Sequence, residues 1–194
     1  GAALASWYIW NKKIRKTDGL FDSMKGAFLG PEFTDIEIIR AVRSTGAVFT
    51  NYDNFDFLCK DVASQIAEGK VVGWFQGRME YGARALGNRS ILANPVFKGI
   101  KDRVNNEVKY RESWRPFCPS MIEDVKNDYI ENVDEASYMI VAYHAKESMK
   151  KNIGVVVHID NTIRPQIVKQ EVNPAFFSLI SNLGKRTGHP VVLN

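Results

Sequence analysis

The sequence predicts a mixed α/β (α+β) protein, a sheet with flanking helices. Three observations support this class. Short apolar runs typical of strands alternate with segments of helical periodicity. Several of the strand candidates follow one another closely, which indicates some antiparallel pairing. The composition of the 194 residues, 45% hydrophobic and 25% charged, is that of a globular protein with one main core.

The first part of the chain is expected to lie outside this core. Residues 1–15 contain a helix over about 1–13, in which small residues give way to Trp7, Tyr8 and Trp10 before a basic end. The helix begins without a capping residue, so we expect it to be the terminal helix of a truncated amino-terminal domain. Residues 16–33 carry the breakers Asp18-Gly19 and Gly30-Pro31 and are predicted to be a linker.

Two capped helices and a strand are predicted at the start of the main domain, residues 34–194. Thr34 and Glu37 form a capping-box pattern, so we expect a helix from Thr34 to about Ser44. Asn54, with the aspartate before it, can cap a second helix that ends at Gly69. The apolar residues 70–75 then predict a short strand that is buried on both faces.

Strands and helices continue to alternate along the rest of the domain. Strands are predicted over residues 90–93, 120–122, 138–143, 154–158, 164–168 and 191–193, and helices over residues 97–108 and 174–185. Pro174 suits the first turn of the last helix, and Gly188 follows its end. Because the chain stops on an apolar strand, we expect the native protein to continue past Asn194.

Composition also bears on location and on metal binding. No run approaches the roughly 20 apolar residues of a membrane-spanning helix, and no basic lead-in marks a signal peptide. We therefore expect a cytoplasmic protein with no membrane partner. Cys59 and Cys118 stand alone and are predicted to be reduced and buried. The three histidines are scattered without ligand spacing, so no metal site is predicted within the chain.

The densest chemical signal is the segment from Gly73 to Ser90. Its glycines permit tight turns and a close approach of backbone N–H groups to a ligand. Arg78, Arg84 and Arg89 supply forked donors suited to phosphate or carboxylate oxygens. The segment has neither the Walker A pattern nor G-x-G-x-x-G. It predicts an anion-binding loop, and a solvated arginine-rich loop with structural glycines is the alternative.

A second basic cluster runs from Lys109 to Ser120. On an extended backbone Lys109 and Arg111 would point the same way and could hold one polyphosphate. Arg115 adds a third cation, and Ser120 offers a hydroxyl group. The alternative is that these cations only pair with neighbouring glutamates on the surface.

A third cluster places polar residues at alternate positions. Alternating residues lie on one face of two short strands joined by a turn, so they are expected to converge on a site. A structural histidine and a turn that needs no ligand are the alternative. The cluster consists of His158, Asp160, Thr162, Arg164 and Gln166.

These clusters, in this order, resemble the carboxy-terminal region of the NodU/CmcH O-carbamoyltransferase family, which modifies hydroxyl groups of antibiotics and nodulation factors. The likeness rests on Gly73-Trp-Phe-Gln-Gly-Arg-Met-Glu-Tyr-Gly-Ala-Arg-Ala-Leu-Gly-Asn-Arg-Ser90, on Arg111-Glu-x-x-Arg115-Pro-Phe-x-Pro-Ser120, on the third cluster, and on Arg186-Thr-Gly-x-Pro-Val-x-Leu-Asn194. One departure is Ala83, where the family usually has proline, so the loop is expected to be more flexible when empty.

The resemblance implies a YrdC-like twisted mixed sheet and an ATP-dependent O-carbamoyltransferase. In this family the YrdC-like part forms carbamoyl-adenylate from ATP and carbamoyl phosphate. An amino-terminal, actin-like part, missing here, holds a metal and transfers the carbamoyl group to a hydroxyl group of a small-molecule acceptor. We therefore expect ATP, with magnesium, and carbamoyl phosphate as ligands, and a fragment that catalyses only the activation half-reaction.

The resemblance also implies roles for the clustered residues. ATP and carbamoyl phosphate together carry about six negative charges, which calls for several fixed cations. Nucleotide binding is expected from Lys109, Arg111, Arg115 and Ser120, and catalytic handling of the carbamoyl group from Arg78, Arg84, Arg89, His158, Asp160 and Arg164.

Two other functions compete with this interpretation. Basic residues near Trp74, Phe75 and Tyr81 also suit a nucleic-acid-binding module without catalytic activity, which is the main alternative. A degenerate interaction domain is the third possibility. Retention of all six cations, Arg78, Arg84, Arg89, Lys109, Arg111 and Arg115, argues against that decay.

Overall fold

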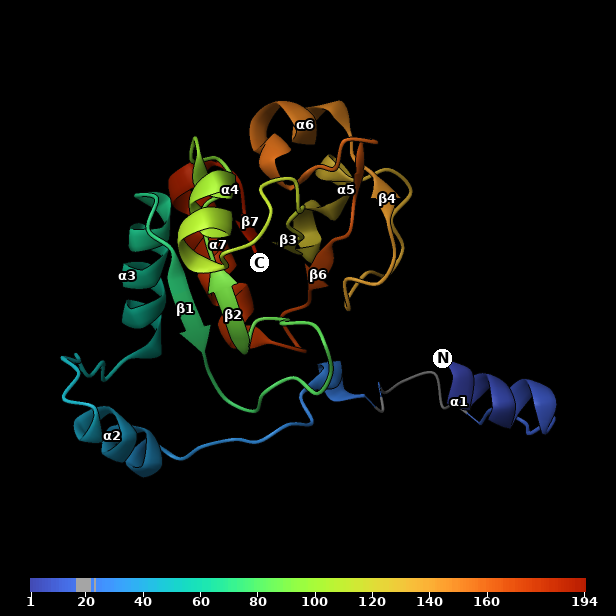
Figure 1. Cartoon of the computed structure of the whole chain (residues 1–194), viewed down its shortest axis with the longest axis horizontal. Coiled ribbons are helices and arrows are strands. Elements are labelled where there is room, and N and C mark those ends of the chain that lie inside the picture. The colour runs from blue at the N-terminus through green and yellow to red at the C-terminus, as the bar shows by residue number, and fades with distance from the viewer. Residues whose placement is uncertain (17–21, 23) are drawn as a thin grey trace.

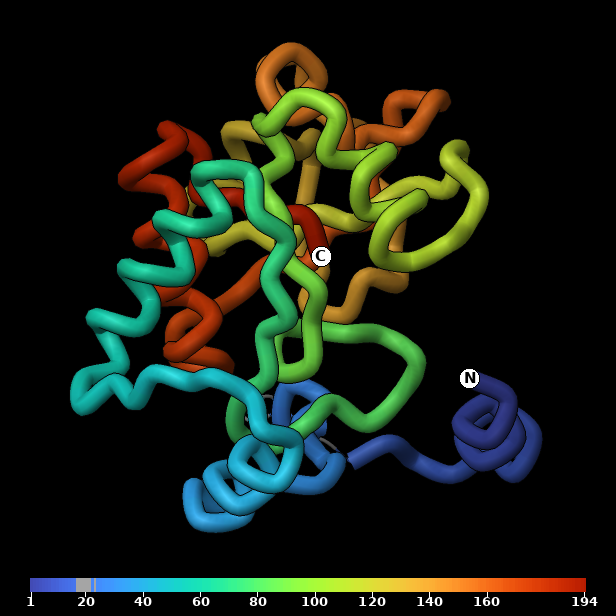
Figure 2. The backbone as a smooth tube through the Cα atoms, turned by 60° about the vertical axis from the view of Figure 1, so that its left-hand side comes forward, coloured from blue at the N-terminus to red at the C-terminus, as the bar shows by residue number. Residues whose placement is uncertain are grey.

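The amino-terminal helix stands apart from the sheet in a computed structural model that describes residues 1–16, 22 and 24–194 (Figures 1 and 2). It consists of α1, Ala2–Ala5, and a π-helical turn η1, Ser6–Trp10. It ends before the predicted boundary near residue 13, and Lys12 adopts a left-handed conformation with φ of 51°. The Asp18-Gly19 breaker of the predicted linker lies outside the described residues.

Part of the predicted linker pairs with the arginine-rich loop. After the short 3-10 turn η2, Lys25–Ala27, the Gly30 amide donates to the Met79 carbonyl at 2.9 Å. The Met79 amide donates in return to the Pro31 carbonyl, also at 2.9 Å. Ala27 is buried against this loop. The connection therefore helps to fix the backbone of the loop.

Both capped helices are confirmed. Helix α2 spans Asp35–Ser44, and the Glu37 carboxylate accepts from the Thr34 amide at 2.8 Å, which completes the capping box. Helix α3 spans Phe55–Ala67, and the Asn54 side chain accepts from the Asp56 amide at 2.7 Å. Helix α3 packs on α7, Pro174–Thr187, whereas α2 buries no residue.

Two small sheets meet edge to edge in the centre of the molecule (Figure 1). In one, β1, Val72–Phe75, pairs antiparallel with β2, Arg89–Leu92. In the other, β3, Pro119–Ile122, pairs parallel with β6, Gln166–Val168, and antiparallel with β7, Val191–Leu193. An antiparallel bridge between Ala93 and Leu193 joins the sheets. The strand order is therefore β1-β2-β7-β3-β6.

Helices cover both faces of these strands. Along β3, Met121 faces one core and Ile122 faces the other, as period-two alternation requires. The Ile122 face packs under α3 and α7. The Met121 face packs under α4, Ile100–Arg103, the π-helical η3, Val104–Val108, and α6, Glu147–Ile153. This arrangement confirms the predicted mixed α/β class with flanking helices.

The carboxy-terminal helix and strand also agree with the prediction. Pro174 occupies the first turn of α7, and the Asn173 side chain accepts from the Phe176 amide at 3.0 Å. Gly188 ends the helix in the left-handed conformation, with φ of 77°, before β7. The strands predicted at 90–93 and 120–122 and the helix predicted at 97–108 are found within about three residues.

Several strand predictions are wrong. Residues 154–156 form the 3-10 turn η5, Gly154–Val156, after helix α6, which the periodicity did not reveal. Short apolar runs do not distinguish strand from helix, and Val156 reaches the core from a turn. Of residues 138–143 only Tyr143 pairs, in β4, Tyr143–His144, because Met139 is left-handed with φ of 54°. In the predicted 164–168 strand only Gln166–Val168 is extended as β6.

The expectation that residues 70–75 are buried on both faces is also wrong. Strand β1 lies at the sheet edge, where no strand of the described chain pairs beyond it. Trp74 is buried, but 51% of Phe75 is exposed. Trp74 packs in the same core as residues of α3, whereas the side of β1 that carries Phe75 stays exposed, which explains the alternation.

Candidate functional site

Loops from four strands meet at one end of the sheet. Asn194, directly after β7, donates its amide to the carbonyl of Cys118, directly before β3, at 3.0 Å. The Asn194 side chain reaches the carbonyl of Ala85, in the loop before β2, at 3.4 Å. Arg164 lies two residues before β6 and contacts Cys118. The structure therefore brings segments of all three sequence clusters to the same sheet end.

A buried amide and hydroxyl network lies beneath this sheet end. Ser120 is fully buried and donates its hydroxyl to Gln166 Oε1 at 2.7 Å. It also accepts from Asn194 Nδ2 at 3.0 Å. Gln166 Nε2 in turn donates to the Leu86 carbonyl at 2.7 Å. The Ser120 hydroxyl, expected to bind nucleotide, thus already joins β3 to β6 and to the arginine-rich loop.

Lys109 and Arg111 share the face of one aromatic ring. The Lys109 ammonium lies 5.8 Å from the Phe117 ring centre, and the Arg111 guanidinium lies 4.5 Å from it. Both cations lie over the Phe117 ring, but the extended backbone proposed for them is wrong. Tyr110 between them is left-handed, with φ of 46°, and folds the chain back.

Lys109 and Arg111 carry like charges and lie close together. Burial lowers the pKa of the Lys109 ammonium group, and the neighbouring Arg111 lowers it further. Burial also lowers the pKa of Arg111, and Arg115 adds to the effect. A bound anion would offset both the lost hydration and the repulsion. The electrostatics of this pair therefore favour an anionic ligand.

An open hollow of about 710 Å³ adjoins the pair, within the range of roughly 300–1,000 Å³ usual for small-molecule sites. Arg115 lies on its wall, where its guanidinium forms an exposed ion pair with Glu112 at 3.5 Å. Such a pair is weak in water and can be replaced by a stronger anion. The lining residues are Asn106, Lys109, Tyr110, Arg111, Glu112 and Arg115.

The third cluster forms a turn rather than the predicted pair of strands. The His158 amide donates to the Thr162 carbonyl at 2.8 Å, and Asp160 Oδ1 accepts from the Thr162 amide at 3.0 Å. Strand β5, Thr162–Ile163, pairs with β4 instead of with residues 154–158. The predicted hairpin partner is therefore wrong, because residues 154–156 are helical.

The turn sets the ionisation of its two titratable groups. Burial lowers the pKa of His158, and Arg164 and Lys101 lower it further, while Asp160 acts in the opposite direction. Hydrogen bonds from Thr162 lower the pKa of Asp160. A neutral imidazole beside an ionised carboxylate is thus favoured at neutral pH.

In the arginine-rich loop, Arg78 faces the amino-terminal connection. It donates to the Gly30 carbonyl at 2.9 Å and pairs with Glu32 at 3.2 Å. Arg84 is exposed, and the structure gives it no hydrogen bond or ion pair to the described part of the chain. Of these two cations, Arg84 is placed to meet a ligand, since it adjoins Ala85 at the sheet end.

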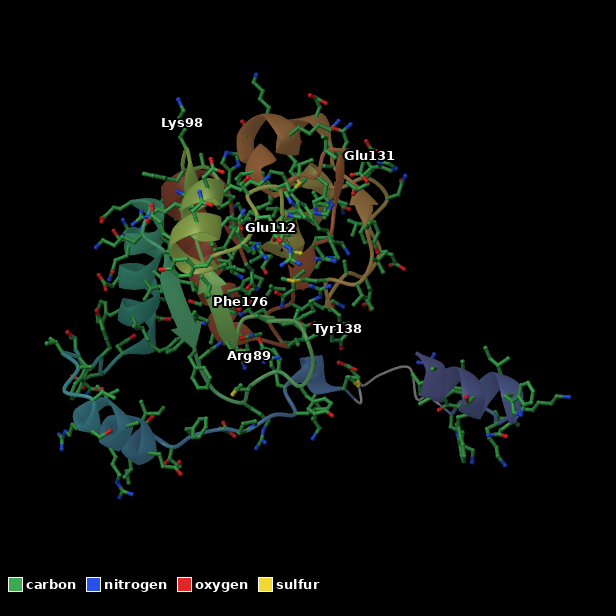
Figure 3. All side chains as sticks on the ribbon, viewed as in Figure 1. Arg89, Lys98, Glu112, Glu131, Tyr138 and Phe176 are labelled. Carbon is green, nitrogen blue, oxygen red and sulfur yellow. The ribbon has the colours of Figure 1, made fainter. Side chains whose placement is uncertain are left out.

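Arg89 neutralises a buried carboxylate that the sequence reasoning missed. The Glu80 side chain is fully buried, and its Oε1 accepts from the amides of Leu86 at 2.5 Å and Asn88 at 2.8 Å. Arg89 Nε lies 3.3 Å from Glu80 Oε2, and Arg89 also donates to the Gly82 carbonyl. Figure 3 shows Arg89 where β2 meets this loop. The signal available in the sequence was that Glu80 is the one acidic residue of this basic, glycine-rich loop.

Gly87 has a packing role within the same loop. Its φ is 107°, and a Cβ atom at this position would lie 2.2 Å from the Phe176 ring. Phe176, labelled in Figure 3, is fully buried on α7. Gly87 therefore lets the loop lie directly on the core, and its presence needs no ligand.

Asn105 is the second residue that the sequence reasoning missed. It is fully buried on η3, and its Oδ1 accepts from Arg111 Nε at 2.7 Å. Its Nδ2 donates to the carbonyls of Ser113 at 3.3 Å and Arg115 at 3.4 Å. One amide thus holds both Arg111 and the loop that carries Arg115. π-Helical turns are frequent at functional sites, but the sequence pattern does not announce them.

Comparison with known proteins identifies the family of this chain. The family model described as carbamoyltransferase C-terminus matches residues 63–194. Nodulation protein NolNO of Sinorhizobium fredii is 46% identical over 143 residues, which are 70% of this chain and 21% of that protein. The 3'-hydroxymethylcephem-O-carbamoyltransferase of Amycolatopsis lactamdurans is 36% identical over 69% of this chain and 25% of its own length. The chain belongs to the carbamoyltransferase C-terminus family.

The relatives are much longer than this chain. An uncharacterized protein of Synechocystis is 35% identical over 100% of this chain, which spans 35% of that protein. The chain thus spans about a fifth to a third of these relatives. Among solved structures, Sua5 of P. abyssi is similar over 72% of this chain and 38% of that one, at 16% identity and a TM-score of 0.45.

Two searches of the described residues gave negative results. No helix in the part of the chain that the structure describes is long and apolar enough to cross a membrane. Within residues 1–16, 22 and 24–194, no three His, Cys, Asp or Glu side chains gather as metal ligands.

Proposed function

We propose that this chain binds ATP and carbamoyl phosphate and forms carbamoyl-adenylate, as the activating part of a longer O-carbamoyltransferase. The observation that carries the proposal is the meeting of Lys109, Arg111 and Arg164 at one sheet end, beside an open hollow. Membership of the carbamoyltransferase C-terminus family supports the class of reaction.

The charges of the site match those of the two substrates. ATP and carbamoyl phosphate bring about six negative charges, and each is attracted to fixed cations more strongly where water is partly excluded. The lowered pKa of Lys109 indicates an ammonium group whose burial and repulsion by Arg111 are not offset by a neighbouring acid of the described chain. Binding of a polyphosphate supplies that compensation. The site is thus better suited to an occupied state than to an empty one.

We assign the triphosphate to the hollow. Lys109, Arg111 and Arg115 line it, and each presents N–H groups to phosphate oxygens. Water would first cleave carbamoyl phosphate to carbamate and phosphate. Attack of a carbamate oxygen on the α-phosphorus of ATP then forms carbamoyl-adenylate and displaces pyrophosphate, and these cations would stabilise the charge that gathers on the pyrophosphate. Magnesium would arrive bound to the triphosphate, since ATP usually carries it.

Carbamoyl phosphate is assigned to the side of the site formed by the third cluster. Arg164 and the exposed Arg84 supply cations there, and the neutral imidazole of His158 can accept or donate a proton next to the carbamoyl group. Asp160 holds the turn that carries His158. The family resemblance implied that Arg78 and Arg89 also handle this substrate. In this proposal they stabilise the loop instead.

The transfer step belongs to the remainder of the longer protein. The relatives include a cephem O-carbamoyltransferase, and we propose a small-molecule hydroxyl group as the acceptor here too. The acceptor pocket and any metal used in transfer would lie outside this chain. A cytoplasmic location is proposed because ATP is supplied there.

Calorimetric titration with ATP and magnesium tests the proposal. We expect the wild-type chain to bind at up to millimolar nucleotide, and Arg111→Ala to bind at least about tenfold more weakly, since a charge-assisted hydrogen bond is worth roughly 1.5–3 kcal/mol. Arg40→Ala, on the exposed surface of α2, is the matched control and should bind like wild type.

Absence of ATP binding by the wild-type chain would contradict the proposal. Retention of RNA that falls with salt and does not respond to ATP would instead favour the nucleic-acid-binding alternative. Release of pyrophosphate that requires both ATP and carbamoyl phosphate would support the activation half-reaction directly.

A further inference from the structure

Cys118 lies where the second and third clusters meet. It directly precedes β3 and is almost fully buried, with 6% of its surface exposed. Its carbonyl accepts from the Asn194 amide at 3.0 Å, which fixes the backbone between β3 and β7. The sulfur atom is therefore held in a defined place at the sheet end.

The guanidinium of Arg164 makes two contacts with this sulfur. Its Nε and Nη2 each lie 3.4 Å from Cys118 Sγ, a distance at which sulfur accepts N–H donors. Two donors of one planar group that share one acceptor fix the plane as well as the position. No other hydrogen bond or ion pair of Arg164 is found within the described chain. Within the described chain, the Cys118 sulfur is thus the only hydrogen-bond acceptor found for the Arg164 side chain.

The same sulfur borders the second cluster. Cys118 belongs to the segment Lys109 to Ser120 that forms this cluster. Phe117, the preceding residue, carries both cations on its ring. The sulfur that holds Arg164 is therefore one residue along the chain from the ring that carries Lys109 and Arg111.

We propose that Cys118 is a positioning residue, whose sulfur holds Arg164 against the Lys109 and Arg111 pair and beside His158. Without this acceptor, the long Arg164 side chain would be free to extend into solvent. The consequence for substrate binding rests on the proposed function, whereas the position of Arg164 does not.

The first test measures Arg164 through its neighbour and needs no ligand. His158 faces Arg164, Lys101 and Asp160, and Arg164 is one cause of its lowered pKa. Cys118→Ala should raise the pKa of His158 in an NMR titration of the imidazole, because a released Arg164 acts on it less. Cys118→Ser keeps an acceptor and should leave the pKa close to wild type.

Cys59→Ala is the matched control for the loss of a buried thiol. Cys59 packs between α3 and α7, in the opposite core, and its replacement should not move the His158 titration. Arg164→Gln should shift the His158 pKa upward as well, and adding Cys118→Ala to it should cause no further shift. If Cys118→Ala folds poorly, Cys118→Val fills a similar volume without a hydrogen-bond acceptor and should raise the His158 pKa in the same way.

The second test measures affinity for carbamoyl phosphate by calorimetry. Cys118→Ala should weaken binding about tenfold, the loss expected for one misplaced charge-assisted contact, while Cys118→Ser stays within about threefold. A His158 shift without any binding by the wild-type chain would refute the proposed function and support the positioning role. An unchanged His158 titration in a folded Cys118→Ala protein would overturn the inference.

Discussion

The two basic segments of this chain use the same residue types in different ways. In the arginine-rich loop, Arg78 donates to Gly30 and Glu32, and Arg89 compensates the buried Glu80. In the Lys109 to Ser120 segment, Lys109 and Arg111 lie over an aromatic ring, and Arg111 also donates to a neutral amide. The density of arginines along a sequence therefore does not locate an anion site.

The difference follows from what each guanidinium is bonded to. A buried carboxylate such as Glu80 requires a cation, so the positive charge of Arg89 is consumed within the fold. Phe117 and Asn105 orient Arg111 without cancelling its charge. Net positive charge is thus left for a ligand mainly in the second segment.

Removal of the Arg89 side chain charge should have the largest effect on stability. Arg89→Met leaves Glu80 buried and unpaired, which costs about 3–5 kcal/mol in comparable cases. Arg84→Met, in the same loop but exposed, should change the free energy of unfolding by less than about 0.5 kcal/mol. Urea unfolding measures the unfolding free energy of both variants. Equal destabilisation would contradict the different roles given to Arg89 and Arg84.

Removal of the Asn105 side chain should affect stability and affinity together. Asn105→Ala leaves two carbonyl groups without their donor and frees Arg111, so we expect a loss of about 2 kcal/mol in unfolding free energy. We also expect ATP binding to weaken about tenfold, measured by calorimetry. Asn152→Ala, exposed on α6, is the control. Normal ATP affinity in folded Asn105→Ala would mean that Arg111 needs no such support.

Arg78→Ala should have a small effect on both properties. Its ion pair with Glu32 is about half exposed, and exposed pairs contribute roughly 0–1 kcal/mol. ATP affinity should stay within about threefold of wild type, in contrast to the tenfold loss in Arg111→Ala. A loss in Arg78→Ala as large as that in Arg111→Ala would place the nucleotide at the arginine-rich loop.

The smallest effect concerns the pH dependence of stability. Burial lowers the pKa of His158 in the folded protein, so the unfolded chain binds the proton at higher pH than the folded chain. Stability should therefore be complete above the ordinary histidine pKa of about 6.5 and decrease as the pH falls below it. His158→Gln should have a flatter profile between pH 7.5 and 5 in thermal unfolding. An unchanged slope would assign the effect to other groups.

Local signals explain what the sequence predicted well. The capping box at Thr34, the Asn54 cap and the Gly188 terminus each depend on residues within one turn. Helix α6 was missed because it has only 7 residues, so the single i, i+4 pair of Met149 and Ile153 is too short a pattern to establish helical periodicity. Its partner surface comes from α5, Lys126–Tyr129, and from η5, which a local pattern does not contain.

For the candidate site, too, the sequence predicted the local features but not the contacts between distant residues. The sequence located the three clusters, and the structure brings segments of all three to one sheet end. The sequence did not reveal which residue each side chain contacts. Glu80 and Arg89 are nine residues apart, and Ser120 and Gln166 are 46 residues apart. Such contacts follow from strand pairing, which the order of residue types along the chain does not specify.

The most direct test of the account is an NMR titration that follows the arginine side-chain Nε–H signals as ATP and magnesium are added. The signals of Arg111 and Arg115 are expected to shift with one common dissociation constant, while those of Arg78 and Arg89 keep their positions. Shifts at Arg78 and Arg89 with none at Arg111 would contradict the account, because the nucleotide would then lie on the arginine-rich loop instead of in the hollow.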